Sequence, residues 1–274
     1  MFDRLEDPTW SKMNGWHLVL PPSRPDTLDL RRISAAADPI PRTANVGILG
    51  STPEFRDLLH EMGFRSITIL ERNTSFFEAM SRQRIYQNVE TLVQGDWLET
   101  LPKLTDNFHL LLSDLTAGNV PYDSRNHFYT GITAALAPGG LFIDKILTNE
   151  NGYISVRAIQ RKYSGQALNL LTANHFSCEA VFCSELQSAS QLIDTTAIYT
   201  ELSELLTGQR LQSFIRYAQL ITPLDCIWYY GVPWSMLRPT YCPRLQLIRR
   251  YDLSSGQPYH AHGFQYVWKK GTLQ

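Results

Sequence analysis

A turn that presents backbone N–H groups to a ligand is encoded at residues 50–54, with the sequence GSTPE, directly after the apolar run 45–49. Glycine lets the backbone approach a ligand closely because it has no Cβ, and proline has the fixed φ preferred in the first turn of a helix. Ser51 or Thr52 is suited to cap that helix. The segment therefore predicts a strand, a tight turn and a helix N-terminus, which attracts an anionic or polar ligand.

Glu54 discriminates between classes of ligand. A carboxylate in the first helical turn repels a pyrophosphate but tolerates a ligand of mixed charge. The dinucleotide fingerprint also requires glycines at the positions that Thr52 and Glu54 occupy. NAD and nucleoside triphosphates are therefore disfavoured. This segment alone leaves open the alternative of a well-capped helix without a ligand.

Acidic side chains follow each of the next three apolar runs. A carboxylate at Glu71 can accept hydrogen bonds from both hydroxyls of a ribose. Asp96 can accept from an exocyclic adenine amine, and the indole of Trp97 can cover a ring face. Asp114 follows the third run. Each acid alone is more often a capping or solubilising residue, but ligands of open α/β sheets bind beyond the carboxyl ends of the strands, so their joint placement favours a binding site.

Short apolar runs alternate with helical patterns along this part of the chain. Such an alternation is typical of βαβ units and a parallel sheet, which would position these residues. Two later runs with a period of two, at 245–251 and 264–269, are expected to complete the sheet as a strand pair. The predicted strands before them are 45–49, 66–70, 90–94, 108–113 and 141–147, and the predicted helices are 53–63, 75–87 and 126–136.

Three regions are expected along the chain. Residues 1–43 are rich in proline, which disfavours long regular elements, and they are interpreted as an N-terminal arm packed across the main domain. Residues 44–147 and 241–274 form the predicted ligand-binding domain. Residues 148–240 are interpreted as an insertion that caps the site.

The insertion holds helical patterns at 154–174 and 196–220, and apolar runs at 179–183 and 226–230. Three consecutive aromatic residues in the last run place side chains on both faces of a strand. Aromatic faces can steady a sulfonium or an amine by cation–π attraction. Tyr229, the middle residue of the three, is therefore a candidate catalytic residue of the pocket.

Composition excludes several other classes of function. The formal net charge of −1 supplies no excess of Lys and Arg to replace the counterions of a nucleic acid. No apolar run reaches the roughly 18 residues of a membrane span, so a cytoplasmic protein without a membrane partner is expected. The four cysteines show no CxxC spacing, and they are interpreted as reduced, mostly buried thiols rather than metal ligands. The sequence leaves the oligomeric state open.

The order of these motifs resembles the class I S-adenosylmethionine-dependent methyltransferases, particularly a divergent bacterial group with a Thr-Pro-Glu turn and a Gly-Asp-Trp motif. The resemblance rests on 50–54, Glu71, 95–97, Asp114 and the LAPGG segment 136–140. It implies an α/β fold with a Rossmann-like methyltransferase sheet, mostly parallel with an antiparallel last strand, and a large insertion between strands five and six.

The resemblance also implies S-adenosylmethionine as the cofactor. In such enzymes the first turn holds the methionine part, the acid after strand two binds the ribose, and the Gly-Asp pair contacts the adenine. The candidate cofactor-binding residues are Gly50, Ser51, Thr52, Glu71, Arg72, Asp96, Trp97, Asp114 and Leu115.

Departures from the family pattern limit the class of substrate. Ile48 stands where family members usually have an acid, and Thr52 and Glu54 replace the second and third glycines. The Asn/Asp-Pro-Pro-Tyr signature of enzymes that methylate exocyclic amines is absent after Asp114, which disfavours DNA adenine methylation.

Methyl transfer from a sulfonium is an in-line displacement, for which a protein mainly aligns the reactants and removes a proton. Asp114 is the candidate catalytic residue for orienting an acceptor or taking its proton. The leading hypothesis is methyl transfer to a small molecule or short peptide held under the insertion. The alternatives are transfer or cyclisation of the aminobutyrate or aminopropyl part of the cofactor, a degenerate scaffold protein, and NAD-dependent oxidoreduction.

Overall fold

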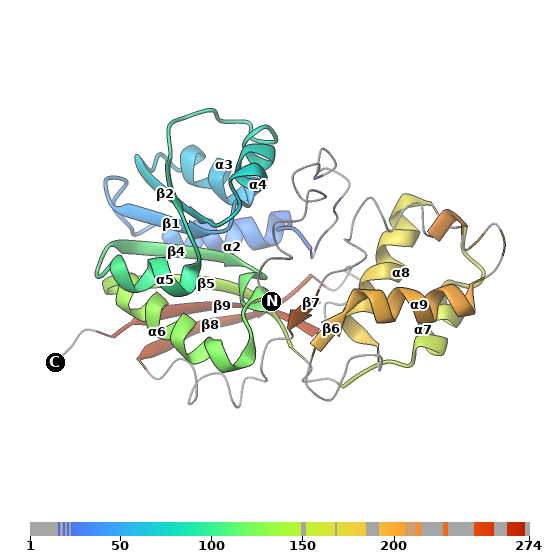
Figure 1. The fold of residues 1–274 in the computed structure, drawn as a ribbon. Helices are drawn as coiled ribbons and strands as arrows, with labels where there is room; N and C mark the ends of the chain where they lie inside the picture. Colours follow the sequence, from blue (N-terminus) through green and yellow to red (C-terminus); the bar gives the residue numbers. More distant parts are fainter. Residues whose placement is uncertain are drawn as a thin grey trace.

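A single large sheet organises the computed structural model (Figure 1). Among the described residues, seven strands form this sheet in the order β3-β2-β1-β4-β5-β9-β8. The structure describes residues 23–148, 152–167, 169–184, 192–206, 212–214, 227–229, 244–254 and 262–271, together with Trp16, Val19, Pro21, Gly208 and Arg210.

Strands β1 to β5 run parallel to one another, and in the described sheet β9 alone runs antiparallel to both of its neighbours. β9 (Gly263–Lys270) pairs antiparallel with β5 and also with β8 (Leu245–Asp252). The parallel strands are β1 (Asn45–Leu49), β2 (Ser66–Glu71), β3 (Thr91–Gln94), β4 (Phe108–Asp114) and β5 (Leu136–Leu147). The strand order reverses between β1 and β4, so the carboxyl ends of these two strands flank the crevice in which open α/β sheets bind ligands.

Helices cover both faces of the sheet because successive strand residues point to opposite sides. On β4, Leu110 and Leu112 pack in one cluster with residues of α2 and α3, whereas Leu111 packs in another with residues of α6. Helix α2 (Thr27–Ala37) precedes β1, and the helices that follow β1 to β4 are α3 (Pro53–Glu61), α4 (Thr74–Ser81), α5 (Trp97–Thr100) and α6 (Arg125–Ala135).

The segment after β5 builds its own apolar cluster beyond the carboxyl ends of β4 and β5 (Figure 1). Its elements are α7 (Val156–Tyr163), α8 (Leu170–Cys183), α9 (Thr195–Leu205), and β6 (Leu192–Asp194) paired antiparallel with β7 (Ile227–Tyr229). Leu147, at the end of β5, belongs to this cluster, and Leu115, just after β4, packs against it. These two residues join the segment to the sheet.

Two predicted helices differ from the structure, and one apolar run lies within a helix. The helix expected over 75–87 ends at Ser81, because Asp57 of α3 accepts the backbone N–H groups of Ile85 and Tyr86 and holds the following chain as a loop. The helix expected over 154–174 is divided into α7 and α8. The apolar run 179–183 is the last part of α8.

The N-terminal prediction also needs correction, since α2 forms within the expected arm, between Pro25 and Pro39. Asp26 begins this helix with a capping box, in which its side chain accepts the N–H of Asp29 and the Asp29 side chain accepts the N–H of Asp26. Reciprocal capping satisfies two N–H groups that a helix start leaves unpaired, so a short helix fits between the prolines.

Cys178 and Cys183 are buried thiols. Cys226 and Cys242 lie outside the described residues. Among the described helices, none is both long and apolar enough to cross a membrane.

Candidate functional site

Gly50 turns the chain from β1 into α3 with a φ of +88°, in the region that favours glycine. Its N–H donates to the carbonyl of Leu70 at 2.9 Å, which ties the turn to β2. Neither Ser51 nor Thr52 makes the side-chain capping hydrogen bond expected at the start of α3. Thr52 is the N-cap residue but makes no side-chain capping bond, and the Ser51 hydroxyl lies 3.4 Å from Glu71 Oε2, to which it donates.

Glu71 lies at the end of β2 and faces this turn. A Cβ added to Gly50 would be 3.9 Å from Glu71 Oε2, and the other carboxyl oxygen accepts the N–H of Asn73 at 2.8 Å. The side chain is buried, and burial raises the pKa of Glu71 to about 7 against the lowering effect of these hydrogen bonds. A buried acceptor beside a glycine turn can receive hydroxyl groups of a ligand.

Asp96 lies on the same rim as Glu71. The N–H of Gly95 donates to the Glu71 carbonyl at 3.3 Å, and Asp96 Oδ2 is 3.9 Å from Arg72 Nη1. The Asp96 side chain also begins α5 by accepting the N–H of Leu98 at 2.9 Å. The structure thus brings together the turn, Glu71, Arg72 and Asp96, which sequence reasoning placed after three different strands.

The indole of Trp97 is fixed against the sheet. Its Nε1 donates to the Leu70 carbonyl at 2.8 Å, and its ring packs on Phe128 with a centroid distance of 6.5 Å. These contacts explain the ring orientation without a ligand. The expected role of Trp97 in covering a ligand ring stays a prediction.

Asp114, at the end of β4, belongs to a buried chain of charges that the sequence analysis missed. Its Oδ1 lies 2.7 Å from the Nζ of Lys145 on β5, and the same Nζ lies 3.4 Å from Oδ2 of Asp29 on α2. Burial raises the pKa of Asp114 to about 6, although the Lys145 ammonium lowers it. Asp114 is therefore held by an ion pair on its sheet side, close to the crevice between β1 and β4.

Leu115 directs the chain away from this ion pair. It has a left-handed conformation with a φ of 59°, and its N–H donates to the Lys145 carbonyl at 2.9 Å. Its side chain packs against the apolar cluster of the segment after β5. Leu115 therefore connects the rim with the segment that was predicted to cap it.

Tyr229 on β7 lies against the segment that follows β4. Its carbonyl accepts from Nη2 of Arg125 at 3.3 Å, and its ring meets Tyr122 edge-on at a centroid distance of 5.8 Å. Arg125 is buried beside Asp144, and burial raises the pKa of Asp144 to about 7, against lowering by the Ser113 hydroxyl and Arg125. Tyr229 is thus near the carboxyl end of β4. The neighbouring Tyr230 lies outside the described residues.

Glu54 has partners from the N-terminal part of the chain. Its Oε1 accepts from the indole Nε1 of Trp16 at 2.9 Å and lies 2.8 Å from Nη2 of Arg24. The carboxylate that sequence reasoning treated as free to discriminate ligands is therefore paired. Its negative charge at the turn is partly compensated by Arg24.

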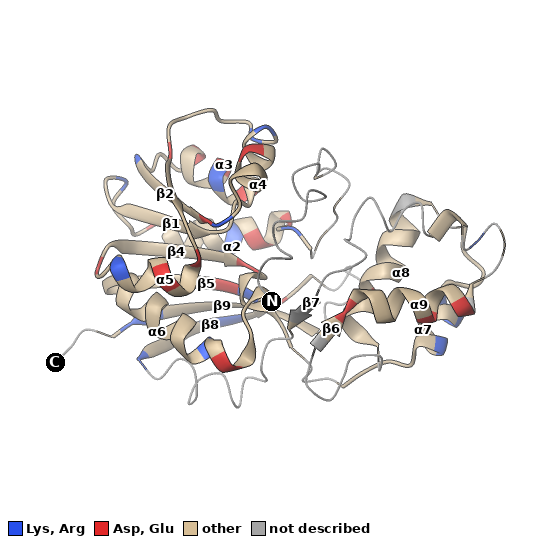
Figure 2. Cartoon of the chain, viewed as in Figure 1, with Lys and Arg blue, Asp and Glu red and all other residues tan. Residues whose placement is uncertain are grey.

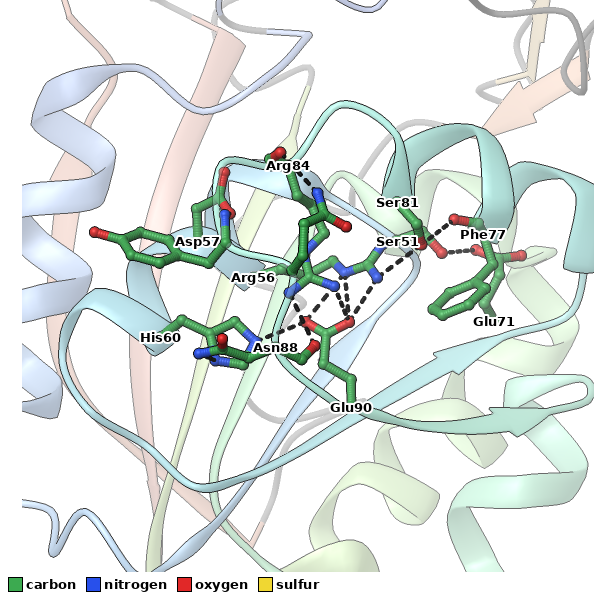
Figure 3. Close-up of polar contacts among 12 residues, drawn as sticks. Ser51, Arg56, Asp57, His60, Glu71, Phe77, Ser81, Arg84, Asn88 and Glu90 are labelled. Carbon is green, nitrogen blue, oxygen red and sulfur yellow. Dashed lines mark hydrogen bonds and ion pairs between the residues drawn. The ribbon is translucent and has the colours of Figure 1, made fainter.

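A second group of charges fixes α3 and thereby the turn. Figure 3 shows Glu90 surrounded by Arg56 of α3, His60 and Arg84. Glu90 Oε2 lies 3.0 Å from Arg56 Nε and 2.7 Å from Arg84 Nη1. All four side chains are almost fully buried, so this group acts as a support for the rim rather than as part of it.

One sequence signal could have found Lys145. Charged residues are almost never fully buried unless they are paired, and Asp144-Lys145 interrupts the apolar strand Leu136–Leu147. Asp29 and Arg24 offer no such signal, because their partners are distant in sequence and known only from the fold. Within the described part of the chain, no group of three or more His, Cys, Asp or Glu side chains could hold a metal ion.

Comparison with known proteins provides evidence on the fold of the chain. No protein-family model and no curated protein sequence matches the chain. Among solved structures, a protein described as a Zn-dependent alcohol dehydrogenase from Rhodobacter sphaeroides is similar, with a TM-score of 0.58 and 12% identity over 96% of this chain and 98% of that one.

Two solved methyltransferases with bound S-adenosylhomocysteine are also similar. The glycopeptide N-methyltransferase MtfA gives a TM-score of 0.51 and 14% identity, covering 89% of each chain. The N-methyltransferase NodS from Bradyrhizobium japonicum gives a TM-score of 0.50 and 9% identity, covering 96% of this chain and 99% of that one. The described sheet, with seven strands and an antiparallel last strand, therefore has the α/β fold of Rossmann-like methyltransferases.

Proposed function

We propose that the protein is an S-adenosylmethionine-dependent methyltransferase that acts on a small molecule or a short peptide. The observation that carries the proposal is the buried Glu71 carboxylate, which faces the Gly50 turn at the switch point of the sheet with Asp96 on the same rim. In this position Glu71 binds the ribose hydroxyls, Asp96 accepts from the adenine amine, and the turn receives the methionine part. The fold shared with MtfA and NodS supports this cofactor.

The acceptor binds, in this proposal, between the end of β4 and the segment after β5. Tyr229 and Leu115 connect these parts, and Asp114 lies at the end of β4 to receive a proton from an acceptor that carries one. Lys and Arg are interspersed with Asp and Glu over the helices that Figure 2 shows, which favours a small acceptor over a nucleic acid.

Calorimetric titration tests the cofactor. The binding of S-adenosylmethionine, and separately of S-adenosylhomocysteine, should give a heat signal that saturates at one molecule per chain. Each compound should also raise the midpoint of thermal unfolding. Glu71→Gln should weaken both effects, whereas Glu78→Gln, an exposed glutamate on α4, should change neither. Binding that is unaffected by Glu71→Gln would contradict the proposed ribose site.

A nicotinamide cofactor is the alternative favoured by the alcohol dehydrogenase neighbour. It predicts a thermal shift with NADH and none with S-adenosylhomocysteine. A scaffold without ligand predicts no shift with any of these compounds. Once an acceptor is found, cofactor labelled separately in the methyl and aminobutyrate carbons distinguishes methyl transfer from transfer of the larger group, because only methyl transfer yields S-adenosylhomocysteine.

A further inference from the structure

Three charged side chains from three distant parts of the chain form a continuous buried row. Asp29 lies on α2, Lys145 on β5 and Asp114 at the end of β4, and each side chain is only 2–3% exposed. The Lys145 ammonium bridges the two carboxylates, at 2.7 Å from Asp114 and 3.4 Å from Asp29. Asp29 is itself held in place by the N–H of Asp26 at 3.2 Å, through the capping box of α2.

We propose that Lys145 is a positioning residue that keeps Asp114 ionised and fixed at the end of β4, and that Asp29 opposes Lys145 in setting the charge of Asp114. The consequence for chemistry rests on the proposed function, because that function gives Asp114 a proton to accept. The acceptor's lone pair forms a bond to the methyl carbon, the C–S electron pair returns to sulfur, and the acceptor proton passes to the Asp114 carboxylate.

The groups that face Asp114 shift its pKa in opposite directions. Burial raises the pKa of Asp114 to about 6, the Lys145 ammonium lowers it, and the carboxylates of Asp29 on α2 and Glu54 on α3 raise it. Asp144 on β5 is also close enough for the two carboxylates to interact. A base functions best when its pKa is near the working pH, so the balance between Lys145 and Asp29 determines how well Asp114 accepts a proton.

This balance predicts shifts of opposite sign for two single substitutions. Lys145→Met removes the cation with little change of volume and should raise the pH at which Asp114 titrates by about 1 to 3 units. Asp29→Asn removes a neighbouring negative charge but keeps an oxygen for the Asp26 N–H, so it should lower that pH. Residues without charge coupling to Asp114 would not produce two shifts of opposite sign.

Carbon-13 NMR of protein labelled at the aspartate carboxyl carbons measures the titration, and Asp114→Asn identifies the resonance. The matched control is Lys270→Met, because Lys270 also lies on the sheet, 2.7 Å from an aspartate, but at the opposite ends of the parallel strands. This control should leave the Asp114 titration unchanged. If Lys145→Met does not fold, the expected downward shift of the Asp114 titration in Asp29→Asn still tests the proposal.

An Asp114 titration that moves in neither variant, or in the same direction in both, would overturn the proposal. This readout needs neither cofactor nor acceptor, so it is independent of the calorimetric test of the proposed function. If methyl transfer is found, the acidic limb of its pH profile should move with the NMR titration in each variant. A profile that stays fixed while the titration moves would show that Asp114 is not the proton acceptor.

Discussion

Gly50 and Gly63 share a backbone conformation but lie in different surroundings. Their φ values are +88° and +85°, a region in which an L side chain costs about 1–2 kcal/mol. A Cβ at Gly50 would enter the space in front of Glu71, whereas a Cβ at Gly63 would meet nothing within 4 Å.

Alanine at either glycine should therefore lower the free energy of unfolding by about 1–2 kcal/mol, measured by urea denaturation. Only Gly50→Ala should also weaken cofactor binding, because its methyl group occupies ligand space. Equal binding by the two variants would show that the Gly50 turn does not contact the cofactor.

Glu71 makes the stability of the protein depend on pH. Its pKa is raised from 4.5 to about 7, so the folded state holds a proton in this range that the unfolded state has lost. Stability should therefore fall as the pH rises from 4.5 to 7, by roughly 3 kcal/mol for this group. Glu71→Gln should be more stable than the wild type above pH 7 and no more stable near pH 4, as measured by urea denaturation at each pH. A stability difference that does not change with pH would contradict the raised pKa.

At the residue scale, sequence reasoning found the groups that follow strands but not those that pair across the fold. Glu71 and Asp96 could be placed because the carboxyl ends of parallel strands share one edge. The Lys145 pair with Asp29 joins positions separated by 116 residues, and no local pattern determines such a contact.

Among the elements, α3 depends on the buried group around Glu90. Glu90→Gln would leave Arg56 and Arg84 buried near each other without a counter-charge, which typically costs about 3–5 kcal/mol. Urea denaturation should show this loss. The matched control is Asp38→Asn, which breaks the exposed Asp38–Arg42 pair and should change stability by less than about 1 kcal/mol. Similar small effects for both variants would contradict a supporting role for Glu90.

Most strands were predicted more accurately than helix ends, although β5 begins at Leu136 and not at 141 as predicted. The strand 45–49 was predicted with its observed bounds, because a buried parallel strand appears as a short apolar run. The end of α4 was wrong by several residues, since it depends on the contact of Asp57 with a loop that local patterns do not show. Helix α2 was missed because proline content was weighed above the capping pair of Asp26 and Asp29.

Across the whole molecule, two apolar regions meet at the ends of β4 and β5. Leu202 of α9 is fully buried in the cluster that also contains Leu147, so Leu202→Ala should cost about 2–5 kcal/mol. Because Leu147 belongs to the sheet as well, unfolding should remain a single transition by circular dichroism and fluorescence. Leu171→Ala on α8, where the leucine is 53% exposed, should change stability little. Separate transitions in Leu202→Ala would show that the segment after β5 unfolds independently.

The sheet was predictable as a whole because its seven strands carry regular apolar patterns. The segment after β5 was recognised only as an interruption between the fifth strand and the last pair. Its long helical pattern at 154–174 was not divided, although Ser164-Gly165 and the α8 N-cap residue Asn169 lie at the break between α7 and α8 and are typical of a turn and a new helix start.

The position of β9 has a consequence for synthesis. β9 follows β8 along the chain, yet it lies inside the sheet between β5 and β8, with Tyr266 and Trp268 fully buried. Until residues 263–270 have left the ribosome, β5 keeps an unpaired edge and β8 has no neighbour. Such open edges favour pairing with other chains. A nascent chain interrupted before this point would therefore be a target for chaperones, and Lys145 would reach its final environment only after residues 263–270 have been synthesised.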